Sequence, residues 1–473
     1  MPKPEMDRRG ERLVETDPVA PTGVEPPLDG ADGGGADAAL PVAPVLGTQR
    51  ISSIDTLRGV AVLGILVMNI PWFALPSSSF FNPLTAGGFE GMDYLAWLIS
   101  HLFFDWKMIT IFSLLFGAGV VVFTQRAEER QGKSAALYYR RMGWMILFGL
   151  IHGYLIWAGD ILYTYGMCGL WVYLFRRRAP WLLITIGVVL LAIGLSSNIA
   201  GGFFFEQARD VAKEAEAVIA AGGTPTPQQS AMLETWRGLN PGPEELAAEA
   251  AAFRGSWWDL TLHQAPWVFW FQTFMFLSLM VWRTGGLMLI GMALMKLGVF
   301  SAARSARAYA AMMIAGYLVG LPIVYAGAQD NIRHEFDLVH GFQFAMQFNY
   351  VGSLFVAAGH IGLVMLVCRL GLWRGATGAL AAVGQMAFTN YLMHSLICSL
   401  IFNGYGLGWW NTLSRIETLG VVLGVWTLQL IVSPIWLRHF HFGPLEWLWR
   451  SLTYWQARPM RRAAAAAPGG GAA

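Results

Sequence analysis

The chain has 473 residues, of which 55% are hydrophobic and only 13% charged, and its mean hydropathy is +0.47. Soluble globular proteins carry about 25% charged residues, so this composition argues against a soluble enzyme and predicts a membrane protein. The net charge is +2 and the sequence has no basic stripe, so we expect no nucleic acid as a partner. The hydrophobic composition predicts membrane lipids as partners.

Both ends of the chain are predicted to be disordered tails. Residues 1–46 are rich in Pro, Gly, Ala and Asp and contain no apolar run of the kind found in a signal peptide. Residues 459–473 have a similar composition. Such stretches bury too little surface to offset their conformational entropy. The folded domain is therefore expected to span residues 50–455.

Within this domain, ten apolar stretches are each close to the 20 or so residues needed to cross a bilayer. They are residues 56–75, 106–125, 141–158, 159–175, 180–200, 280–299, 305–327, 346–369, 379–402 and 418–437. Two further apolar stretches, 94–104 and 262–279, adjoin members of this set. The sequence therefore predicts an all-α, polytopic transmembrane bundle with ten crossings, or with twelve if both extra stretches also span.

The distribution of lysine and arginine favours ten crossings. Short cytoplasmic loops are enriched in these residues, and ten crossings place every basic cluster on the cytoplasmic side. The clusters lie in 126–141, 176–178, 304–307, 369–374 and 438–462. We therefore expect both chain ends in the cytoplasm of a bacterial-type cell, the bundle in the plasma (inner) membrane, and 94–104 and 262–279 as re-entrant or interfacial helices.

Two segments are expected outside the crossings. Residues 201–260 form an outer loop with short helices near 205–221 and 243–254, which is either a cap over a site or a passive connector. Residues 440–455 combine tryptophan with arginine, the composition of a cytoplasmic interfacial helix. Neither segment carries a catalytic motif, so the candidate site residues lie in the predicted crossings.

Charged side chains inside a bilayer are costly, and they usually face the bundle interior at a site or pathway. Asp55 and Arg58, three residues apart, share a face at the start of the first predicted helix. They form either a local ion pair or a site for the phosphates of an acyl donor, which suit the donor fork of arginine. Asn69 lies three turns further along, where it either joins helices or faces a site.

His152 and Asp160 form a second candidate pair. A carboxylate beside a histidine orients the ring and stabilises its charged form, which is the minimal arrangement of a general base. Eight residues are too many for contact along one straight helix, so the pair requires the turn at 158–160 to fold Asp160 back. Without that contact, His152 is a buried histidine with a structural hydrogen bond.

Further polar residues converge on the same half of the predicted bundle. Ten crossings place Lys107, Arg283 and His101 in the outer half of the membrane together with His152, so His101 is an alternative catalytic residue. Asn390 is an amide deep in an apolar helix and needs a partner. The nine histidines are too scattered along the sequence to predict a metal site, and we expect no metal.

Five segments, in this order, resemble the YeiB-like family of bacterial multi-pass membrane proteins. They are IDTLRGVAVLGILVMNIPWFALP (54–76), KMITIFSLLFGAG (107–119), IHGYLIWAGDILYTYG (151–166), GQMAFTNYL (384–392) and FGPLEWLWRSLTY (442–454). That family is similar to a superfamily of transmembrane acyltransferases, which includes the acyltransferase-three enzymes and the lysosomal heparan glucosaminide acetyltransferase. The shared signature is D-x-x-R-G, here Asp55, Arg58 and Gly59.

The resemblance implies a membrane acyltransferase. It would move an acyl group, such as acetyl, from cytoplasmic acyl-CoA (acetyl-CoA) to an envelope glycan, lipid or small-molecule acceptor. The sequence departs from the acyltransferase-three pattern at Asn69, where that pattern has a histidine. We assign the general base to His152, because it lies in a segment that resembles the family and has Asp160 close by. The residues expected to hold the donor or the developing charge are Asp55, Arg58, Asn69, Lys107, Arg283 and Asn390. The alternative function is a small-solute transporter or exporter that uses the same buried polar residues as a pathway.

Overall fold

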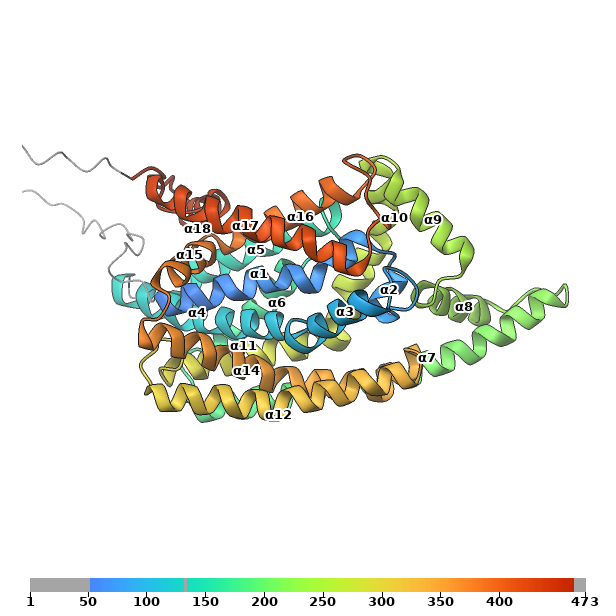
Figure 1. Cartoon of the computed structure of the whole chain (residues 1–473), viewed down its shortest axis with the longest axis horizontal. Coiled ribbons are helices and arrows are strands. Elements are labelled where there is room, and N and C mark those ends of the chain that lie inside the picture. Colours follow the sequence, from blue (N-terminus) through green and yellow to red (C-terminus); the bar gives the residue numbers. More distant parts are fainter. Residues whose placement is uncertain (1–51, 132–133, 463–473) are drawn as a thin grey trace, which may run out of the picture. The chain divides into compact units, whose positions relative to one another are not determined.

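The computed structural model describes residues 52–131 and 134–462, and these residues are helical apart from turns, loops and one isolated β-bridge between Phe440 and Arg461. Among them, seven helices are long and apolar enough to cross a membrane. Figure 1 shows that the helices run side by side along the horizontal axis. The predicted tail at 1–46 and the end of the second tail, 463–473, lie outside the described residues.

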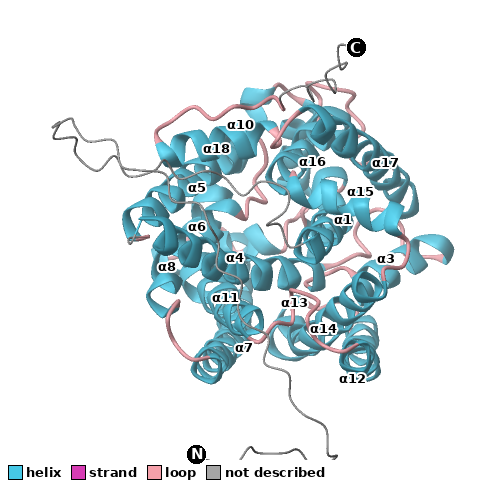
Figure 2. Cartoon of the chain, turned by 90° about the vertical axis from the view of Figure 1, so that its left-hand side faces the viewer, coloured by secondary structure: helices cyan, strands magenta, loops and turns pink. Residues whose placement is uncertain are grey.

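Two helices form the centre of the bundle. In α1 (Ser52–Ala74), 67% of the most apolar window is buried, compared with 22% in α12 (Ala306–Arg333) and 28% in α17 (Arg415–His439). In the stretch Gly91–Glu129, which contains most of α4 (Lys107–Gln131), 61% of the corresponding window is buried. The end-on view in Figure 2 accordingly places α1 and α4 inside a ring of other helices. Residues on these two helices therefore face protein, whereas α12 and α17 present apolar side chains outward.

The stretches 94–104 and 262–279, predicted as re-entrant or interfacial helices, are both helical and adjoin α4 and α11. The first is part of α3, which leads into α4 through a turn at Trp106, a non-glycine residue with φ of 68°. The second belongs to a helix that continues from α10 through the π-helical segment η3 into α11. The bounds are α3 (Gly91–Phe103), α10 (Trp257–Trp270), η3 (Phe271–Met280) and α11 (Val281–Lys296). The second stretch therefore lengthens α11, whereas the first forms most of α3, which a turn separates from α4.

The predicted outer loop is largely helical. α7 (Pro180–Ala220) has 41 residues and is about 60 Å long at about 1.5 Å per residue, twice the thickness of a bilayer core. The helix predicted near 205–221 is therefore the end of α7. α9 (Pro243–Arg254) confirms the prediction for 243–254, whereas α8 (Pro227–Leu239), which starts with a capping box at Thr226 and Gln229, was not expected. These helices lie at one end of the bundle, on the right in Figure 1, which we call the α9 end.

The remaining helices complete the bundle. They are α2 (Ser78–Phe81), α5 (Ala135–Leu155), α6 (Leu162–Val172), η2 (Tyr173–Phe175), α13 (Leu338–His340), η4 (Gly341–Ala345), α14 (Met346–Leu370), α15 (Arg374–Gln385), α16 (Ala387–Phe402) and α18 (Pro444–Tyr454). The predicted crossing at 379–402 is thus divided at Met386 into α15 and α16. α18 matches the helix predicted within 440–455 and lies at the opposite end from α9, which we call the α18 end.

The C-terminal tail begins later than the sequence suggested. The backbone N–H of His441 donates to the carbonyl of Met460, and that of Arg462 donates to the carbonyl of His439. Residues 459–462 therefore run back along the end of α17 and are part of the folded structure.

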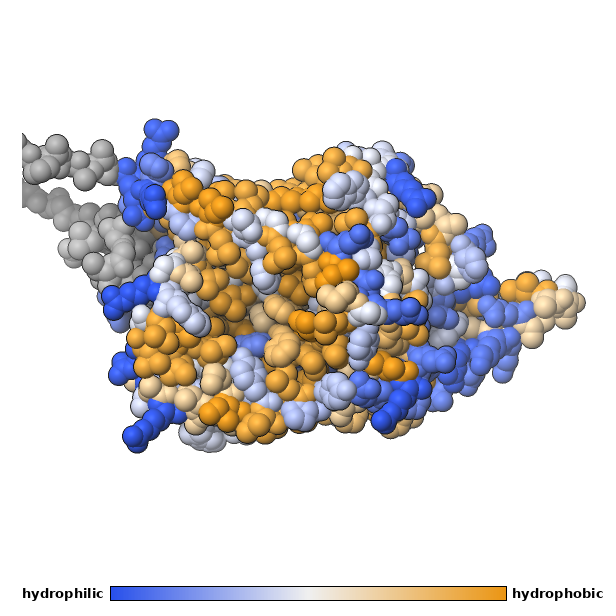
Figure 3. All heavy atoms as spheres, viewed as in Figure 1, coloured by the Kyte–Doolittle hydropathy of each residue, from blue (hydrophilic) through white to orange (hydrophobic). Residues whose placement is uncertain are grey.

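The surface between the two ends of the bundle is apolar. Leu318 on α12 and Leu423 on α17 are 71% and 59% exposed, and apolar side chains cover most of the face shown in Figure 3 between two hydrophilic ends. An exposed surface made mostly of apolar side chains is suited to contact with lipid rather than with water. Together with the long apolar helices, this surface identifies a multi-pass membrane protein.

Two close helix crossings explain glycines in the family-like segments. A Cβ atom added to Gly117 on α4 would lie 1.9 Å from the carbonyl oxygen of Met288, and one added to Gly291 on α11 would lie 1.9 Å from that of Leu114. Gly59 on α1 and Gly384 on α15 meet in the same way. Small residues allow this backbone contact between membrane helices. Gly59 of the D-x-x-R-G signature therefore has a packing role.

Candidate active site

A line of three buried side chains joins α5, α6 and α16. Nδ1 of His152, near the end of α5, lies 2.8 Å from Oδ1 of Asp160, and Nε2 lies 2.8 Å from Oγ of Ser395 on α16. His152 and Ser395 are 0% and 1% exposed. The chain between α5 and α6 does fold back as the predicted pair requires, because the turn brings Asp160 against the preceding helix. Ser395 was not among the site residues predicted from the sequence.

The hydrogen bonds around Asp160 fix the direction of this line. Its Oδ1 also accepts from the backbone N–H of Leu162 at 3.1 Å, and its Oδ2 accepts from that of Tyr163 at 2.8 Å, so the carboxylate caps the start of α6. An ionised carboxylate can only accept, so Nδ1 of His152 carries a proton. In the neutral ring Nε2 is then an acceptor for the hydroxyl of Ser395. A hydroxyl, an imidazole and a carboxylate are therefore in hydrogen-bond contact, which is the arrangement by which a base can activate a nucleophile.

A cavity of about 310 Å³ reaches from the α9 end into the bundle. Its walls are mainly apolar and rich in aromatic side chains, and its polar groups include Ser113 and Tyr165, whose hydroxyl oxygens lie 2.7 Å apart. The tryptophans in the wall are Trp72, Trp97, Trp106, Trp157, Trp267 and Trp270. Binding sites for small molecules have this size and character, with a few polar groups placed among apolar ones.

The turn between α5 and α6 separates the Ser395–His152–Asp160 line from this cavity. Trp157, Ala158, Gly159 and Ile161 line the cavity, whereas Asp160 points to the other side, where it meets His152. The ring of Trp157 stacks on Phe73 at 4.3 Å between centroids and lies 6.2 Å from the ring of His152. One short turn therefore lies between the histidine and the cavity.

Arg283 is a buried cation in the cavity wall. It is 4% exposed, donates to the carbonyl of Tyr350 at 3.0 Å and to the hydroxyls of Thr110 and Ser353 at 3.1 and 2.8 Å, and lies over the rings of Trp106 and Tyr350. Its Nε has no hydrogen-bond partner, and no carboxylate among the described residues forms an ion pair with it. A buried charge without a counter-ion is costly, so this site favours an anionic ligand.

A second buried cation, Lys107, and a pair formed by a histidine and a carboxylate lie beside Arg283. Lys107 is completely buried and donates to the amide oxygen of Asn349 at 2.6 Å and to the carbonyl of His101. His101 lines the cavity, and its Nδ1 lies 3.5 Å from Oδ2 of Asp105, which lines it too. Of the two candidate histidines, His101 faces the cavity directly and His152 is the one with short hydrogen bonds on both nitrogens.

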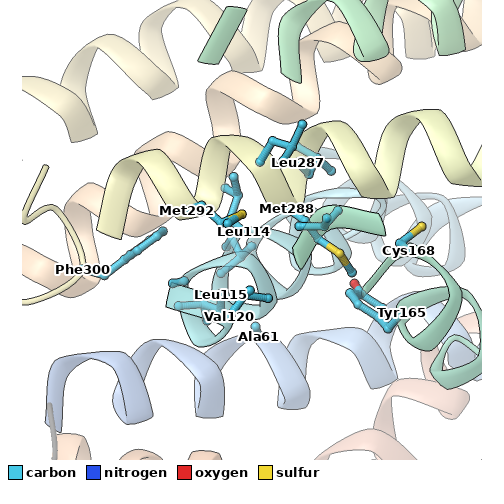
Figure 4. Close-up of a cluster of buried hydrophobic side chains, with 14 of the residues drawn as sticks. Ala61, Leu114, Leu115, Val120, Tyr165, Cys168, Leu287, Met288, Met292 and Phe300 are labelled. Atoms are coloured by element: carbon cyan, nitrogen blue, oxygen red, sulfur yellow. The ribbon is translucent and has the colours of Figure 1, made fainter. Parts of the chain in front are cut away.

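The other predicted site residues are divided between the two ends of α1. Asn69 lines the cavity, whereas Arg58 donates to Asp55 at 2.8 Å near the α18 end. On α1 the cavity extends no further than Val67, about 14 Å along the helix axis from Arg58 at about 1.5 Å per residue. The packed cluster in Figure 4, which includes Ala61, Leu114 and Met288, fills the interior between these levels. Arg58 and the cavity are therefore not joined by open space in this conformation.

Asn390 has a separate environment. Its amide nitrogen donates to the carbonyl of Val383 and to the hydroxyl of Ser433, each at 3.1 Å, and its backbone carbonyl accepts from Gln429. These bonds join α16 to α15 and α17. Asn390 is buried and does not line the cavity.

Comparisons with known proteins identify the family. The chain is 32% identical to the uncharacterized protein YeiB of Escherichia coli (strain K12) over 425 residues, which cover 87% of this chain and 98% of that protein. The chain belongs to the YeiB-like family. A family member from Bacillus subtilis (strain 168), the uncharacterized protein YxaH, is 30% identical over 437 residues, with 89% of this chain and 98% of that protein covered.

A family model described as a protein of unknown function (DUF418) matches residues 294–456. This region runs from the end of α11 through α18. Within the YeiB-like chain it contains Ser395 and Asn390, whereas His152, Asp160 and Arg283 precede it. The candidate site therefore draws its residues from both sides of the DUF418 boundary.

Proposed function

We propose that this protein is a membrane acyltransferase in which Ser395, His152 and Asp160 are the reacting group, the general base and the group that orients the base. The observation that carries the proposal is the unbroken hydrogen-bonded line from Ser395 through His152 to Asp160 beside an aromatic cavity. The resemblance to transmembrane acyltransferases supports the same reaction class.

The proposed topology has ten crossings, with both chain ends in the cytoplasm of a bacterial-type cell and the bundle in the plasma membrane. The crossings are α1, α3–α4, α5, α6 with η2, α7, α10–α11, α12, α13–α14, α15–α16 and α17. In this arrangement, the arginines at 176–178, 304–307, 369–374 and 438–450 are all at the α18 end. The positive-inside rule then makes the α18 end cytoplasmic and the α9 end external.

The proposed reaction has two steps. The hydroxyl oxygen of Ser395 attacks the thioester carbonyl of an acyl-CoA, its proton moves to Nε2 of His152, and the CoA thiolate leaves and takes that proton. An acceptor hydroxyl or amine then attacks the Ser395 ester, gives its proton to His152, and releases Ser395 as the hydroxyl again. Asp160 stays ionised throughout and stabilises the charged ring.

Access sets the conformational requirement of this reaction. Because Ser395 is buried, the turn at 157–161 must move to admit the acyl group from the cavity. Arg58 with Asp55 would hold the donor phosphates at the cytoplasmic end, so the cluster around Ala61 must open to let the donor reach Ser395. Arg283, Lys107 and Asn69 would stabilise negative charge in the outer half.

An anion transporter is the second candidate. Two buried cations lie beside the cavity, which is open toward the α9 end and closed by packed side chains toward the α18 end. This arrangement is typical of a substrate pathway in a conformation that is open to one side only. Transport requires no chemical change of the substrate. It also makes no use of the Ser395 hydroxyl, which is the residue that distinguishes the two proposals.

The experiment is release of CoA from labelled acetyl-CoA by the protein in nanodiscs, with wild type, Ser395→Ala, His152→Ala and His101→Ala compared. We expect a loss of at least about 100-fold for the first two, in the range of a lost general base, and activity within a few-fold of wild type for His101→Ala. Ser399→Ala is the matched control, because Ser399 is a buried serine one turn further along α16. Loss of activity in His101→Ala alone would assign the base to the cavity histidine instead, and flux of unmodified substrate without CoA release would indicate transport.

A further inference from the structure

Three potential metal ligands that are separated in the sequence meet at the α9 end. Asp330 lies in the last turn of α12, His334 follows that helix, and His340 ends α13. One ligand atom from each residue lies within 4.8 Å of the other two. Nε2 of His340 is 2.8 Å from Oδ2 of Asp330. Nδ1 of His334 is 3.5 Å from Oδ1 of the same carboxylate and 2.9 Å from the backbone carbonyl oxygen of Asp330, a bond that it must give up if it is the nitrogen that binds an ion. No metal site was predicted from the sequence, because the nine histidines are scattered along it; the turn after α12 brings His334 and His340 together.

The backbone between the two histidines is strained. Glu335 and Phe336 are consecutive non-glycine residues with φ of 50° and 56°, in the left-handed region that costs such residues free energy. This turn reverses the chain and stacks the ring of His340 on that of His334, with centroids 3.6 Å apart. Asp337 accepts from the backbone N–H of His340 at 2.8 Å and holds the turn closed. Strain of this kind is found where a ligand is clamped.

The three side chains are also held in place and open to solvent. Phe336 is buried, and Leu338 and Val339 belong to a buried cluster, so the turn is anchored on its inner side. The side chains of His334, Asp330 and His340 are 46%, 28% and 24% exposed. An ion can therefore reach the cluster from the aqueous side without any opening of the bundle.

We propose that Asp330, His334 and His340 form a binding site for a divalent transition-metal ion, with Zn²⁺ as the reference ion. Two imidazoles and one carboxylate are ligands that suit zinc and other late first-row metals, whereas Mg²⁺ and Ca²⁺ prefer oxygen ligands. In a tetrahedral zinc site with bonds of roughly 2.0–2.2 Å, ligand atoms lie roughly 3.4 Å apart. The cluster therefore closes on an ion with shifts of about 1 Å, and water completes the fourth position.

The site joins the end of α12 to α13, next to the mouth of the cavity. Asn331 and Phe336, which lie between the ligands in sequence, both line the cavity, as does Phe342 two residues after His340. A bound ion would hold these wall residues in place. The inference does not depend on acyl transfer, because it requires only the geometry of the three ligands.

The test is Zn²⁺ binding by the full-length protein in nanodiscs after removal of metal with a chelator. We expect one Zn²⁺ per chain by elemental analysis and calorimetry, a higher thermal unfolding temperature with Zn²⁺, a ligand-field spectrum with Co²⁺, and no comparable effect of Mg²⁺. His340→Ala and Asp330→Asn should weaken Zn²⁺ binding by at least about 100-fold, since loss even of outer partners costs 10–100-fold. His263→Ala, which removes an exposed histidine on α10, is the matched control and should bind as wild type does.

Asp330→Asn keeps the size of the side chain, so it guards against a folding defect in the alanine variant. Folding of each variant is checked by its elution profile and by its unfolding temperature without metal. Wild-type protein that binds no stoichiometric Zn²⁺ would overturn the proposal. Equal binding by folded Asp330→Asn and His340→Ala would overturn it as well, because the ion would then be held elsewhere.

Discussion

The crossing of α4 and α11 offers a matched pair of substitutions two residues apart. A Cβ at Gly117 would lie 1.9 Å from the carbonyl oxygen of Met288, whereas real Cβ contacts are not shorter than 3.0 Å, so Gly117→Ala must separate the helices by about 1 Å. The blocking atom belongs to the backbone and cannot rotate away. A Cβ at Gly119 meets nothing within 4 Å. Gly119→Ala is therefore the control on the same helix.

The two substitutions are expected to change the stability of the fold in opposite directions. Overpacking costs about 1–3 kcal/mol, and the gain from replacing glycine by alanine in a helix is about 1 kcal/mol. Gly117→Ala should therefore be destabilised by up to about 2 kcal/mol, and Gly119→Ala should be unchanged or stabilised by up to about 1 kcal/mol. Separation of α4 and α11 would also lengthen the bond from Arg283 to Thr110, now 3.1 Å, beyond hydrogen-bond range.

The assay is thermal unfolding of the two variants and wild type in the same detergent, followed by tryptophan fluorescence and by retention of the monodisperse peak. The unfolding temperature should fall for Gly117→Ala and stay or rise for Gly119→Ala. Equal shifts in the two variants would refute the reasoning, because they would show that the close backbone contact does not limit the packing of α4 on α11.

Three further outcomes follow from single side chains. Burial raises the pKa of the Glu249 carboxyl, which accepts hydrogen bonds from Ser77, so the folded state binds the carboxyl proton more tightly than the unfolded state does. The contribution of this proton to the free energy of unfolding is full below about pH 4.3 and is lost as pH rises through the raised pKa. Glu249→Gln should therefore remove this pH dependence when unfolding is measured against pH. Arg415 donates to three backbone carbonyls of the 83–88 loop. Arg415→Met should therefore lower the free energy of unfolding by about 1–3 kcal/mol in chemical denaturation. An unchanged denaturation midpoint would show that these hydrogen bonds do not stabilise the fold. Arg283→Met removes a buried charge that has no counter-ion, so it should abolish binding of an anionic ligand without lowering the unfolding temperature. A lower unfolding temperature with unchanged anion binding would show that Arg283 stabilises the fold and does not bind the ligand.

Much of the helical architecture was predictable, because hydrophobic length is a strong signal in membrane proteins. The predicted stretches at 56–75 and 418–437 correspond closely to α1 and α17. The boundaries failed where an apolar run and a polar run form one continuous helix, as in α7, which continues through Gly201 and Gly202 into the polar run. Capping by Thr226 at α8 is a local signal that was present in the sequence.

The candidate site was predictable only in part. The contact between His152 and Asp160 was anticipated, because a short turn between two helices limits where Asp160 can lie. Ser395 could not be found, since serine in an apolar helix normally bonds its own backbone and 243 residues separate it from His152. The cluster of Asp330, His334 and His340 depends on a reversal through left-handed Glu335 and Phe336, which no residue type there announces.

The most direct test of the central claim is the position of the acyl group on the protein. Wild type and Ser395→Ala are incubated with labelled acetyl-CoA without an added acceptor, quenched in acid, digested and mapped by mass spectrometry. The proposal predicts an acetyl ester on Ser395 in wild type and no labelled residue in Ser395→Ala. CoA release with no label on Ser395, or equal labelling of another residue in both proteins, would contradict Ser395 as the reacting group.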